Sequence, residues 1–312
     1  MSLEDGDGYI SPFNTSCRLM SDAWKSTLIS AACCLLAPLT VVLNLVVVVS
    51  ISHFRHFQTT TNIILLSMAV SDLLVGLAMM PLMIITLDFC WCINSFLCFF
   101  FHLLGFVLTS ASVGNMVLIS VDRYVAICYP LRYSSIKPNT VKICVSVCWT
   151  SSIIYNLILL KDNLLHLDSS SCYKKCPLLL NDILAIVDVV ITFYVPLTVI
   201  IVLYARVFVV AVTQARAMRS QVSTTGSKTE SAMKSELRAA RTLGIVILFF
   251  LMCFFPYYIS SLIGQGMNIE VSTVQLLLFY CNSTINPIIY AFFYPWFRKT
   301  VKLLLNCKFC KL

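Results

Sequence analysis

Charge is scarce in this sequence. Only 12% of the 312 residues are Asp, Glu, Lys or Arg, whereas soluble domains carry about 25%. Hydrophobic residues make up 59%, and the mean hydropathy is +0.89. A soluble fold cannot hide that much apolar surface, so the composition excludes an ordinary soluble protein and indicates one that crosses a membrane repeatedly.

The sequence also lacks the usual elements of catalytic chemistry. It has no internal repeat and no Walker-type glycine loop, and its four His are scattered without metal-ligand spacing. The apolar segments do not form two corresponding halves with interrupted helices, which is the pattern of secondary transporters. No apolar signal core precedes residue 26. We therefore predict no enzyme and no resident cofactor, apart from the candidate Na⁺ discussed below.

Seven apolar stretches are each long enough to cross a bilayer, which takes about 20 residues. They lie at 27–51, 61–87, 95–128, 141–160, 184–212, 239–264 and 272–293. Because lipid offers the backbone no hydrogen-bond partner, such spans must be helices. The sequence therefore predicts an all-α membrane protein, a seven-transmembrane-helix bundle followed by a short amphipathic cytoplasmic helix.

Basic residues set the orientation of the bundle. With seven crossings, 17 of the 22 Lys and Arg fall on the face that holds Arg123, and 5 fall on the other face. The positive-inside rule places the first face in the cytoplasm and the N-terminus outside the cell. Basic loops beside anionic membrane lipid also account for the net charge of +8, so we predict no nucleic-acid partner.

This topology divides the chain into three parts. We predict an extracellular N-terminus at 1–26, the seven-helix bundle at 27–293, and an amphipathic helix with a cytoplasmic tail at 294–312. The polar, Ser/Thr-rich stretch 214–235 is predicted to be a mobile third cytoplasmic loop.

Several residues outside the spans are candidates for covalent modification. Asn14 begins a glycosylation sequon, which can also remain unused. Cys307 and Cys310 follow a basic tail and are candidates for palmitoylation, with two unmodified thiols as the alternative. Six cysteines fall outside or at the outer edge of the membrane: Cys17, Cys90, Cys92, Cys98, Cys172 and Cys176. Six thiols allow 15 pairings, so the residues alone leave their connectivity open.

Two carboxyl groups remain inside the spans, where ionisable groups are costly and mark functional sites. Asp72 lies in the second span, at a depth shared with Ser112, Asn282 and Asn286 on other spans. Carboxylate, hydroxyl and amide oxygens gathered in this way are suited to a small hard cation such as Na⁺. A purely structural hydrogen-bond network between helices is the alternative.

The second carboxyl group is Asp188, about 12 Å outward along the fifth span from Pro196. No Lys or Arg occurs at comparable depth in any span. Burying a carboxylate without a counter-ion is costly, so the missing cation is a candidate ligand. The alternative is a neutral Asp188 that hydrogen-bonds to a neighbouring helix or to water.

A set of motifs occurs together in chain order. They are Asn44, the run 65–72, Asp122-Arg123-Tyr124, Trp149, Pro196 with Tyr204, Pro256, and the run 286–290. Through them the chain resembles the rhodopsin-like (class A) G protein-coupled receptors. In the segments 172–176, 239–245 and 282–299 it is most similar to the trace amine-associated receptors, especially the fish olfactory type. The resemblance implies a plasma-membrane receptor for a small amine, which activates a Gs-type (Gs or Golf) heterotrimeric G protein and catalyses nothing.

The resemblance also supplies what the residues alone leave open. It implies the disulfides Cys98–Cys176 and Cys17–Cys172, with no assigned partner for Cys90 or Cys92. Amine receptors usually carry an aspartate on the third span where this chain has Gly105, and some fish members carry an acid on the fifth span, as Asp188 does here. The amine is then expected to point its other end toward the room left by Gly105.

The remaining site residues are also carried over from the resemblance. The implied ligand pocket is Asp188, Gly105, Phe106, Thr109, Phe254, Tyr257, Tyr258 and Tyr280, although each aromatic taken alone is more often core packing. The implied coupling and switch residues are Asp122, Arg123, Tyr124, Tyr204, Glu236, Phe250, Asn286, Pro287 and Tyr290. Arg123 with Asp122 and Glu236 is expected to form a cytoplasmic lock that opens on activation. A receptor for a non-amine odorant and an amine transporter remain the alternative functions.

Overall fold

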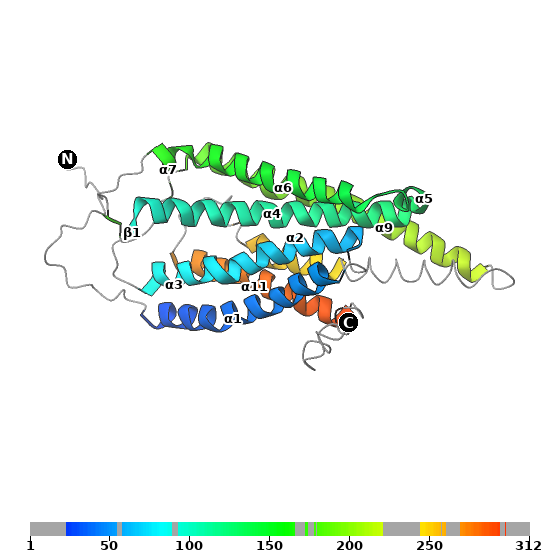
Figure 1. Cartoon of the computed structure of the whole chain (residues 1–312). Coiled ribbons are helices and arrows are strands. Elements are labelled where there is room, and N and C mark those ends of the chain that lie inside the picture. The colour runs from blue at the N-terminus through cyan, green and yellow to red at the C-terminus, as the bar shows by residue number, and fades with distance from the viewer. Residues whose placement is uncertain are drawn as a thin grey trace.

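The computed structural model describes residues 23–54, 58–88, 93–165, 172–173, 178, 180–220, 244–256, 258–259, 269–293 and 297. Its helices run side by side in an elongated bundle (Figure 1). Five are long and apolar enough to cross a membrane: Thr27–His53, Thr60–Ile85, Ser95–Cys128, Pro138–Leu159 and Asp182–Val210. The shorter apolar helix Gly244–Pro256 and the 25-residue α11 (Ile269–Phe293) lie in the same bundle, at the sixth and seventh predicted spans.

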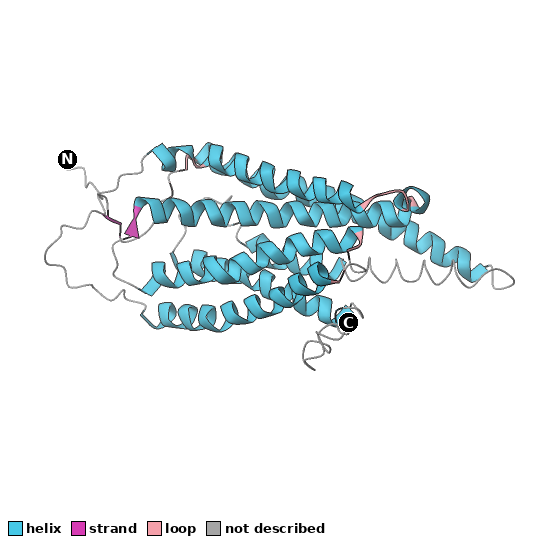
Figure 2. Ribbon diagram, in the orientation of Figure 1, coloured by secondary structure: helices cyan, strands magenta, loops and turns pink. Residues whose placement is uncertain are grey.

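In chain order the other described elements are α1 (Ala23–His53), α2 (Thr60–Leu74), η2 (Val75–Met79), α3 (Met80–Asp88), β1 (Ile93–Asn94), α4 (Ser95–Cys128), α5 (Pro130–Tyr133), α6 (Pro138–Leu159), α7 (Lys161–Leu165), β2 (Cys172–Tyr173), α8 (Asp182–Val189), η3 (Val190–Tyr194) and α9 (Val195–Ser220). Helices dominate the described chain (Figure 2). The second span is α2, η2 and α3 in sequence, and the fifth is α8, η3 and α9. The π-helical turns η2 and η3 follow directly after the segments that carry Asp72 and Asp188, and such turns are frequent at functional sites.

The structure corrects one predicted boundary. The stretch 214–235 was expected to be a mobile loop, but α9 continues through its first residues to Ser220. Residues 214–220 include Gln, Ala, Arg and Met, which are good helix formers outside the membrane, and hydropathy does not register them. Residues 221–235 lie outside the described part of the chain. α4 begins and ends where the third span was predicted.

Polar side chains fix where several helices begin. The side chains of Thr59, Asn94 and Asn181 accept hydrogen bonds from the backbone N–H groups at the starts of α2, α4 and α8. These caps satisfy donors that have no partner within the helix. Pro138 begins α6, where a missing N–H costs nothing.

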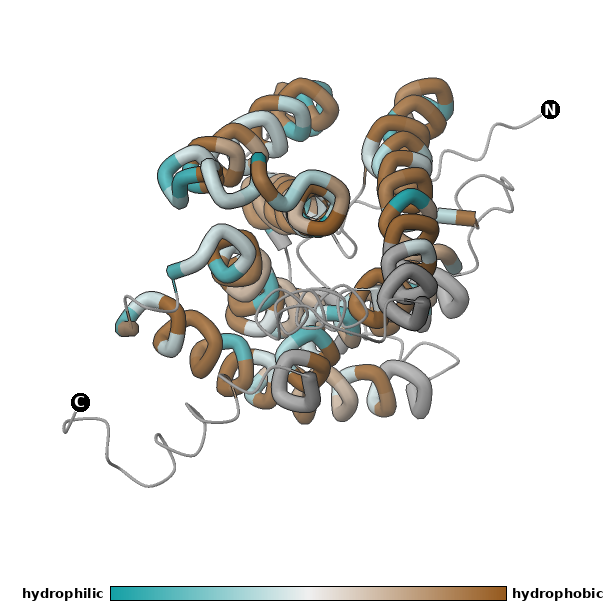
Figure 3. The backbone as a smooth tube through the Cα atoms, turned by 90° about the vertical axis from the view of Figure 1, so that its right-hand side faces the viewer, coloured by the Kyte–Doolittle hydropathy of each residue, from teal (hydrophilic) through white to brown (hydrophobic). Residues whose placement is uncertain are grey.

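Hydrogen bonds between side chains tie the helices together within an apolar bundle. Trp149 of α6 donates its indole N–H to the Ser67 hydroxyl of α2 over 2.9 Å, and Ser67 donates to Asn115 of α4 over 2.9 Å. The amide of Asn44 on α1 donates to the backbone carbonyl of Ser283 on α11. Seen along the bundle, apolar residues dominate the helices (Figure 3). Where lipid surrounds the helices, such polar contacts contribute to specific association.

A short antiparallel strand pair lies at the outer end of the bundle. Ile93 pairs with Tyr173, and Asn94 pairs with Cys172. Cys98, one turn into α4, is disulfide-bonded. Cys17 and Cys176 lie outside the described residues, as does the side chain of Cys172, so the two implied pairings remain predictions. The strand pair does bring the second outer loop to the start of α4.

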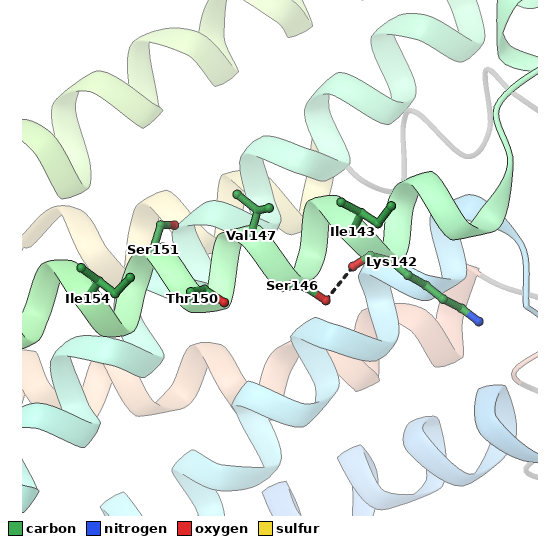
Figure 4. A pocket seen from close by; sticks show the side chains of 7 residues that line it. All are labelled: Lys142, Ile143, Ser146, Val147, Thr150, Ser151 and Ile154. Atoms are coloured by element: carbon green, nitrogen blue, oxygen red, sulfur yellow. Dashed lines mark hydrogen bonds between the residues drawn. The ribbon is translucent and has the colours of Figure 1, made fainter.

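The outward face of α6 carries a shallow hollow of about 470 Å³ (Figure 4). Its lining includes the exposed side chains Ile143, Val147 and Ile154. Ser146 donates its hydroxyl to the backbone carbonyl of Lys142 in the same helix, so the hydroxyl does not need a bound molecule as a hydrogen-bond partner. We interpret the hollow as a lipid-facing surface, because exposed apolar side chains of one helix line it.

Gly114 allows α4 and α6 to approach closely. A methyl group on Gly114 would overlap the Sγ of Cys148. Overpacking of this kind costs about 1–3 kcal/mol. We expect Gly114→Ala to lower both the amount of receptor at the cell surface and its melting temperature in detergent.

A matched control is available at Gly244, where an added methyl would meet Tyr204 at an ordinary 3.5 Å. Gly244→Ala should therefore keep the stability of the wild type, and Cys148→Ala should restore the stability of Gly114→Ala. Wild-type surface level and melting temperature in Gly114→Ala alone would contradict the close approach.

Candidate functional site

Asp188 is buried where the fifth span faces α6. Its side chain is 7% exposed at the end of α8. The Tyr155 hydroxyl of α6 donates to its Oδ1 over 3.0 Å. Within the described chain no Lys, Arg or His forms an ion pair with it. A neutral phenol is thus its only identified side-chain hydrogen-bond donor, and a cationic partner is missing.

Two further hydrogen bonds involve the backbone of Asp188 and the residue next to Tyr155. Thr192 in η3 donates its hydroxyl to the backbone carbonyl of Asp188 over 2.7 Å. Asn156, next to Tyr155, donates to the Ser110 hydroxyl of α4 over 3.0 Å. The Asn156 side chain is fully buried, and its Oδ1 has no partner among the described residues. Sequence reasoning missed Tyr155 and Asn156 in the fourth span and Ser110 in the third, although polar residues within apolar spans were a signal.

The space beside Gly105 is not empty. A Cβ on Gly105 would lie 3.0 Å from the terminal methyl of Met79. The ligand was expected to extend into this space, and the Met79 side chain occupies part of it. The hydroxyl of Thr109 donates to the Gly105 carbonyl over 2.8 Å, so only its lone pairs remain for a ligand.

The aromatic residues form a stacked ladder rather than an open cage. Phe193 of η3 stacks on Tyr258 at 4.2 Å between ring centroids, and Phe254 stacks on Phe250 at 4.1 Å. Phe254 also meets Phe279 of α11 at 4.2 Å. All of these rings except Phe279 are 1–4% exposed. Phe193 and Phe279 were not predicted from the sequence, because no motif marks them.

The other predicted pocket residues have different degrees of exposure. Tyr280 is 1% exposed and packs with Met79 and Leu108, while Phe106 is half-buried. Tyr257 lies outside the described residues. Phe250, one of the predicted switch residues, belongs to one buried cluster with Val113, and Pro196 lies half-buried in α9.

The four predicted Na⁺ residues are all buried. The Asn286 amide donates to Asp72 Oδ2 over 2.9 Å, and Ser71, next to Asp72, shares a hydrogen bond with Ser112 over 3.2 Å. Oδ1 atoms of Asp72, Asn282 and Asn286 have no partner among the described residues. Buried acceptors without donors are expensive, and three such oxygens fit the chemistry of a hard cation.

At the opposite end of the bundle, Arg123 is held in a buried network. Its Nη2 lies 2.6 Å from Asp122 Oδ2 and also donates to the hydroxyls of Thr61 and Tyr133. Thr61 and Tyr133 each donate to Asp122, over 2.8 Å and 3.2 Å. The sequence prediction named Asp122 but not Thr61 or Tyr133. Glu236 and the side chain of Tyr290 lie outside the described residues.

Tyr124 and Tyr204 also belong to the predicted coupling set. Tyr124 follows Arg123 and packs edge-on against Tyr129 at 5.8 Å. Tyr204 of α9 is half-buried and lies beside Gly244 of the sixth-span helix. Pro287 is buried within α11, one residue after Asn286.

The amino-acid sequence is similar to those of known membrane receptors. The family described as "7 transmembrane receptor (rhodopsin family)" matches residues 43–290. Trace amine-associated receptor 13c of Danio rerio is 37% identical over 285 residues, which cover 86% of this chain and 83% of that protein. The chain belongs to the trace amine-associated receptors. It is also 36% identical to trace amine-associated receptor 1 of Mus musculus, over 85% of each chain, and 34% identical to trace amine-associated receptor 6 of Homo sapiens, over 86% and 83%.

Membership of this receptor family settles several predictions. The resemblance to class A receptors and the all-α, seven-helix membrane architecture are confirmed. The protein is a multi-pass plasma-membrane receptor, not an enzyme, and it works with a small-molecule ligand and a G protein. Asn14, Cys307, Cys310 and all of 294–312 except Phe297 lie outside the described residues.

Proposed function

We propose that this receptor detects a primary amine, whose ammonium group pairs with Asp188, and that it activates a Gs-type G protein. The names of the relatives, trace amine-associated receptors, support an amine as the ligand. The observation that carries the proposal is the environment of Asp188, which is 7% exposed and has no cationic partner within the described chain. A buried carboxylate of this kind costs several kcal/mol unless a charge compensates it.

The geometry around Asp188 suits one ammonium group. Tyr155 engages Oδ1 from the α6 side, which leaves the second oxygen to accept a charge-assisted hydrogen bond. Phe193 follows Asp188 in the same span and stacks on Tyr258 at 4.2 Å, and aromatic faces attract cations. One carboxyl group at this depth favours a monoamine over a diamine.

The aromatic ladder offers a route from ligand to G protein. Phe193, in the same span as Asp188, stacks on Tyr258 of the sixth-span helix, and Phe254 of that helix stacks on Phe250. A ligand that shifts this ladder would bias the position of the helix Gly244–Pro256. Outward movement of that helix opens the cytoplasmic face around Arg123, where a G protein binds.

Sequence features support the remaining parts of the proposal. The distribution of Lys and Arg favours an extracellular N-terminus. The Gs or Golf assignment depends on the resemblance to fish olfactory members. Glu236 and Tyr290 as partners of Arg123, the disulfides Cys98–Cys176 and Cys17–Cys172, and the modifications at Asn14, Cys307 and Cys310 are proposed on the same grounds.

We also propose that Asp72, Ser112, Asn282 and Asn286 hold Na⁺ in the resting receptor, where the ion would neutralise the buried carboxylate. The unpartnered oxygens described above support this proposal. Replacing choline chloride by NaCl at equal ionic strength should lower agonist potency in the wild type. Asp72→Asn should remove that difference, and an equal sodium effect in both receptors would contradict the site.

The direct test is a cAMP assay on cells that display the wild-type receptor. A panel of primary, secondary and tertiary amines is compared with non-amine odorants of the same carbon skeleton. We expect responses to primary amines alone, without accumulation of labelled amine in the cells. Responses to the non-amine odorants would favour the rival receptor function, and accumulation would favour a transporter.

A further inference from the structure

The phenol of Tyr155 has a hydrogen-bonding capacity that its contact with Asp188 does not use. Its hydroxyl oxygen lies 3.0 Å from Asp188 Oδ1 and is the donor in that hydrogen bond. A phenol donates one proton and keeps lone pairs that accept hydrogen bonds. Among the described residues, no group donates to this oxygen. The Tyr155 oxygen is therefore an available acceptor directly beside the carboxyl group of the proposed ion pair.

The surroundings of Asp188 offer few other acceptors in the part of the chain that the structure describes. Val189 and Val190, which follow it, are apolar. The backbone carbonyl of Asp188 already accepts the Thr192 hydroxyl over 2.7 Å. A charged donor that binds to this carboxyl group therefore has the Asp188 oxygens and the Tyr155 phenol as its nearest identified acceptors.

Amines differ in the number of hydrogen bonds that their charged head group donates. A protonated primary amine carries three N–H groups, whereas a protonated tertiary amine carries one. The single N–H of a tertiary ammonium is satisfied by Asp188 alone, so it has no donor left for a second acceptor. A primary ammonium needs more than one acceptor, because a buried donor without a partner is costly.

We propose that Tyr155 makes the receptor prefer primary over tertiary amines, because its hydroxyl donates to Asp188 and at the same time accepts from a second N–H of the bound ammonium group. This inference depends on the proposed pairing of an amine with Asp188. It adds the residue that distinguishes the two classes of amine and the atom through which it does so.

The test compares two amines of one carbon skeleton, hexylamine and N,N-dimethylhexylamine, or the same pair built on the most potent primary amine of the cAMP panel. Where the tertiary amine does not activate, its affinity is measured as inhibition of the response to the primary amine. Tyr155→Phe keeps the ring and removes the hydroxyl. We expect the primary amine to lose about tenfold in potency, the value of one hydrogen bond to a charged group, and the tertiary amine to change little.

A second substitution separates the two roles of the hydroxyl. The indole N–H of tryptophan donates a hydrogen bond but the ring accepts none. Tyr155→Trp should therefore lose the preference for the primary amine as Tyr155→Phe does. Thr198→Val is the control, because it removes an exposed hydroxyl of the same span as Asp188, one that donates only to the backbone carbonyl of Tyr194. It should leave both potencies unchanged at matched surface levels.

The inference is overturned if Tyr155→Phe at the cell surface weakens both amines equally, as a purely structural role would, or weakens neither. A wild-type preference in Tyr155→Trp would also overturn it, since donation alone would then suffice. A wild type that responds to no amine, or a response that survives Asp188→Asn in full, overturns the proposed function instead, so the two failures are distinguishable.

Discussion

Asp188→Asn is expected to lower the potency of amines about a hundredfold. Asparagine keeps the size of the side chain and an oxygen that accepts the hydrogen bond of Tyr155, so the substitution removes little except the charge. Truncating one partner of a buried charge pair costs about 2–5 kcal/mol, and a mid-range value of about 3 kcal/mol corresponds to about a hundredfold in potency. The measurement is a cAMP dose-response curve at matched surface expression.

Two further variants distinguish the effect of the Asp188 charge from the effect of the hydrogen bond that Tyr155 donates to it. Asp182→Asn changes the same residue type at the exposed start of α8 and should leave potency unchanged. Tyr155→Phe keeps the carboxylate but removes its only identified donor, so we expect a loss of about tenfold, the value of one hydrogen bond to a charged group. Full potency in Asp188→Asn would place the amine elsewhere, with Asp182 as the next acid to test.

Asp122→Asn should raise ligand-independent signalling strongly. The Asp122 carboxylate accepts hydrogen bonds from Arg123, Thr61 and Tyr133, so it is the acceptor that these three side chains share. A hydrogen bond to a charged group contributes about 1.5–3 kcal/mol. A loss of about 2 kcal/mol that falls only on the resting state would shift its equilibrium with the active state about thirtyfold. The measurement is cAMP without ligand, normalised to receptor at the surface.

Tyr133 and Glu236 provide the comparison for that experiment. Tyr133→Phe removes the hydroxyl that bonds Arg123 and Asp122 over 3.2 Å each, together with its bonds to Thr60 and Thr61, but it leaves the ion pair of Arg123 with Asp122. It should therefore raise basal signalling less than Asp122→Asn does. Glu236→Ala tests the partner predicted from the sequence. If basal signalling rises only in the Glu236 variant, the network of Asp122, Thr61 and Tyr133 does not hold the resting state.

The sequence predicted the positions of the polar groups better than their partners. Asp72 and Asp188 were identified because acids within apolar spans are rare and costly, and Asp122 was identified because it belongs to the motif Asp122-Arg123-Tyr124. Their neighbours Asn286 and Arg123 were identified because they belong to recognisable runs. Tyr155, Thr61 and Met79 were missed, since nothing in the local sequence distinguishes them from residues that face lipid or fill a core.

In the pocket, too, the sequence did not reveal which residues of other helices are near. Gly105 was expected to leave room for the ligand, but that prediction took account of only one helix. The structure fills that room from η2 with Met79. Likewise, the aromatic residues were expected as a cage, but Phe193 and Phe279 from neighbouring helices stack them into a ladder.

The sequence by itself determined the architecture, because an apolar span in lipid must satisfy its own backbone hydrogen bonds and has only the helix available. It also indicated the orientation, through the unequal charge of the two faces. Only the tertiary structure decided which side chains meet. Helix rotation, tilt and π-helical turns set those contacts, and they result from packing among all the helices, which hydropathy does not encode. The pairing of Tyr155 with Asp188 and the contact of Met79 with Gly105 are therefore properties of the bundle rather than of any one segment.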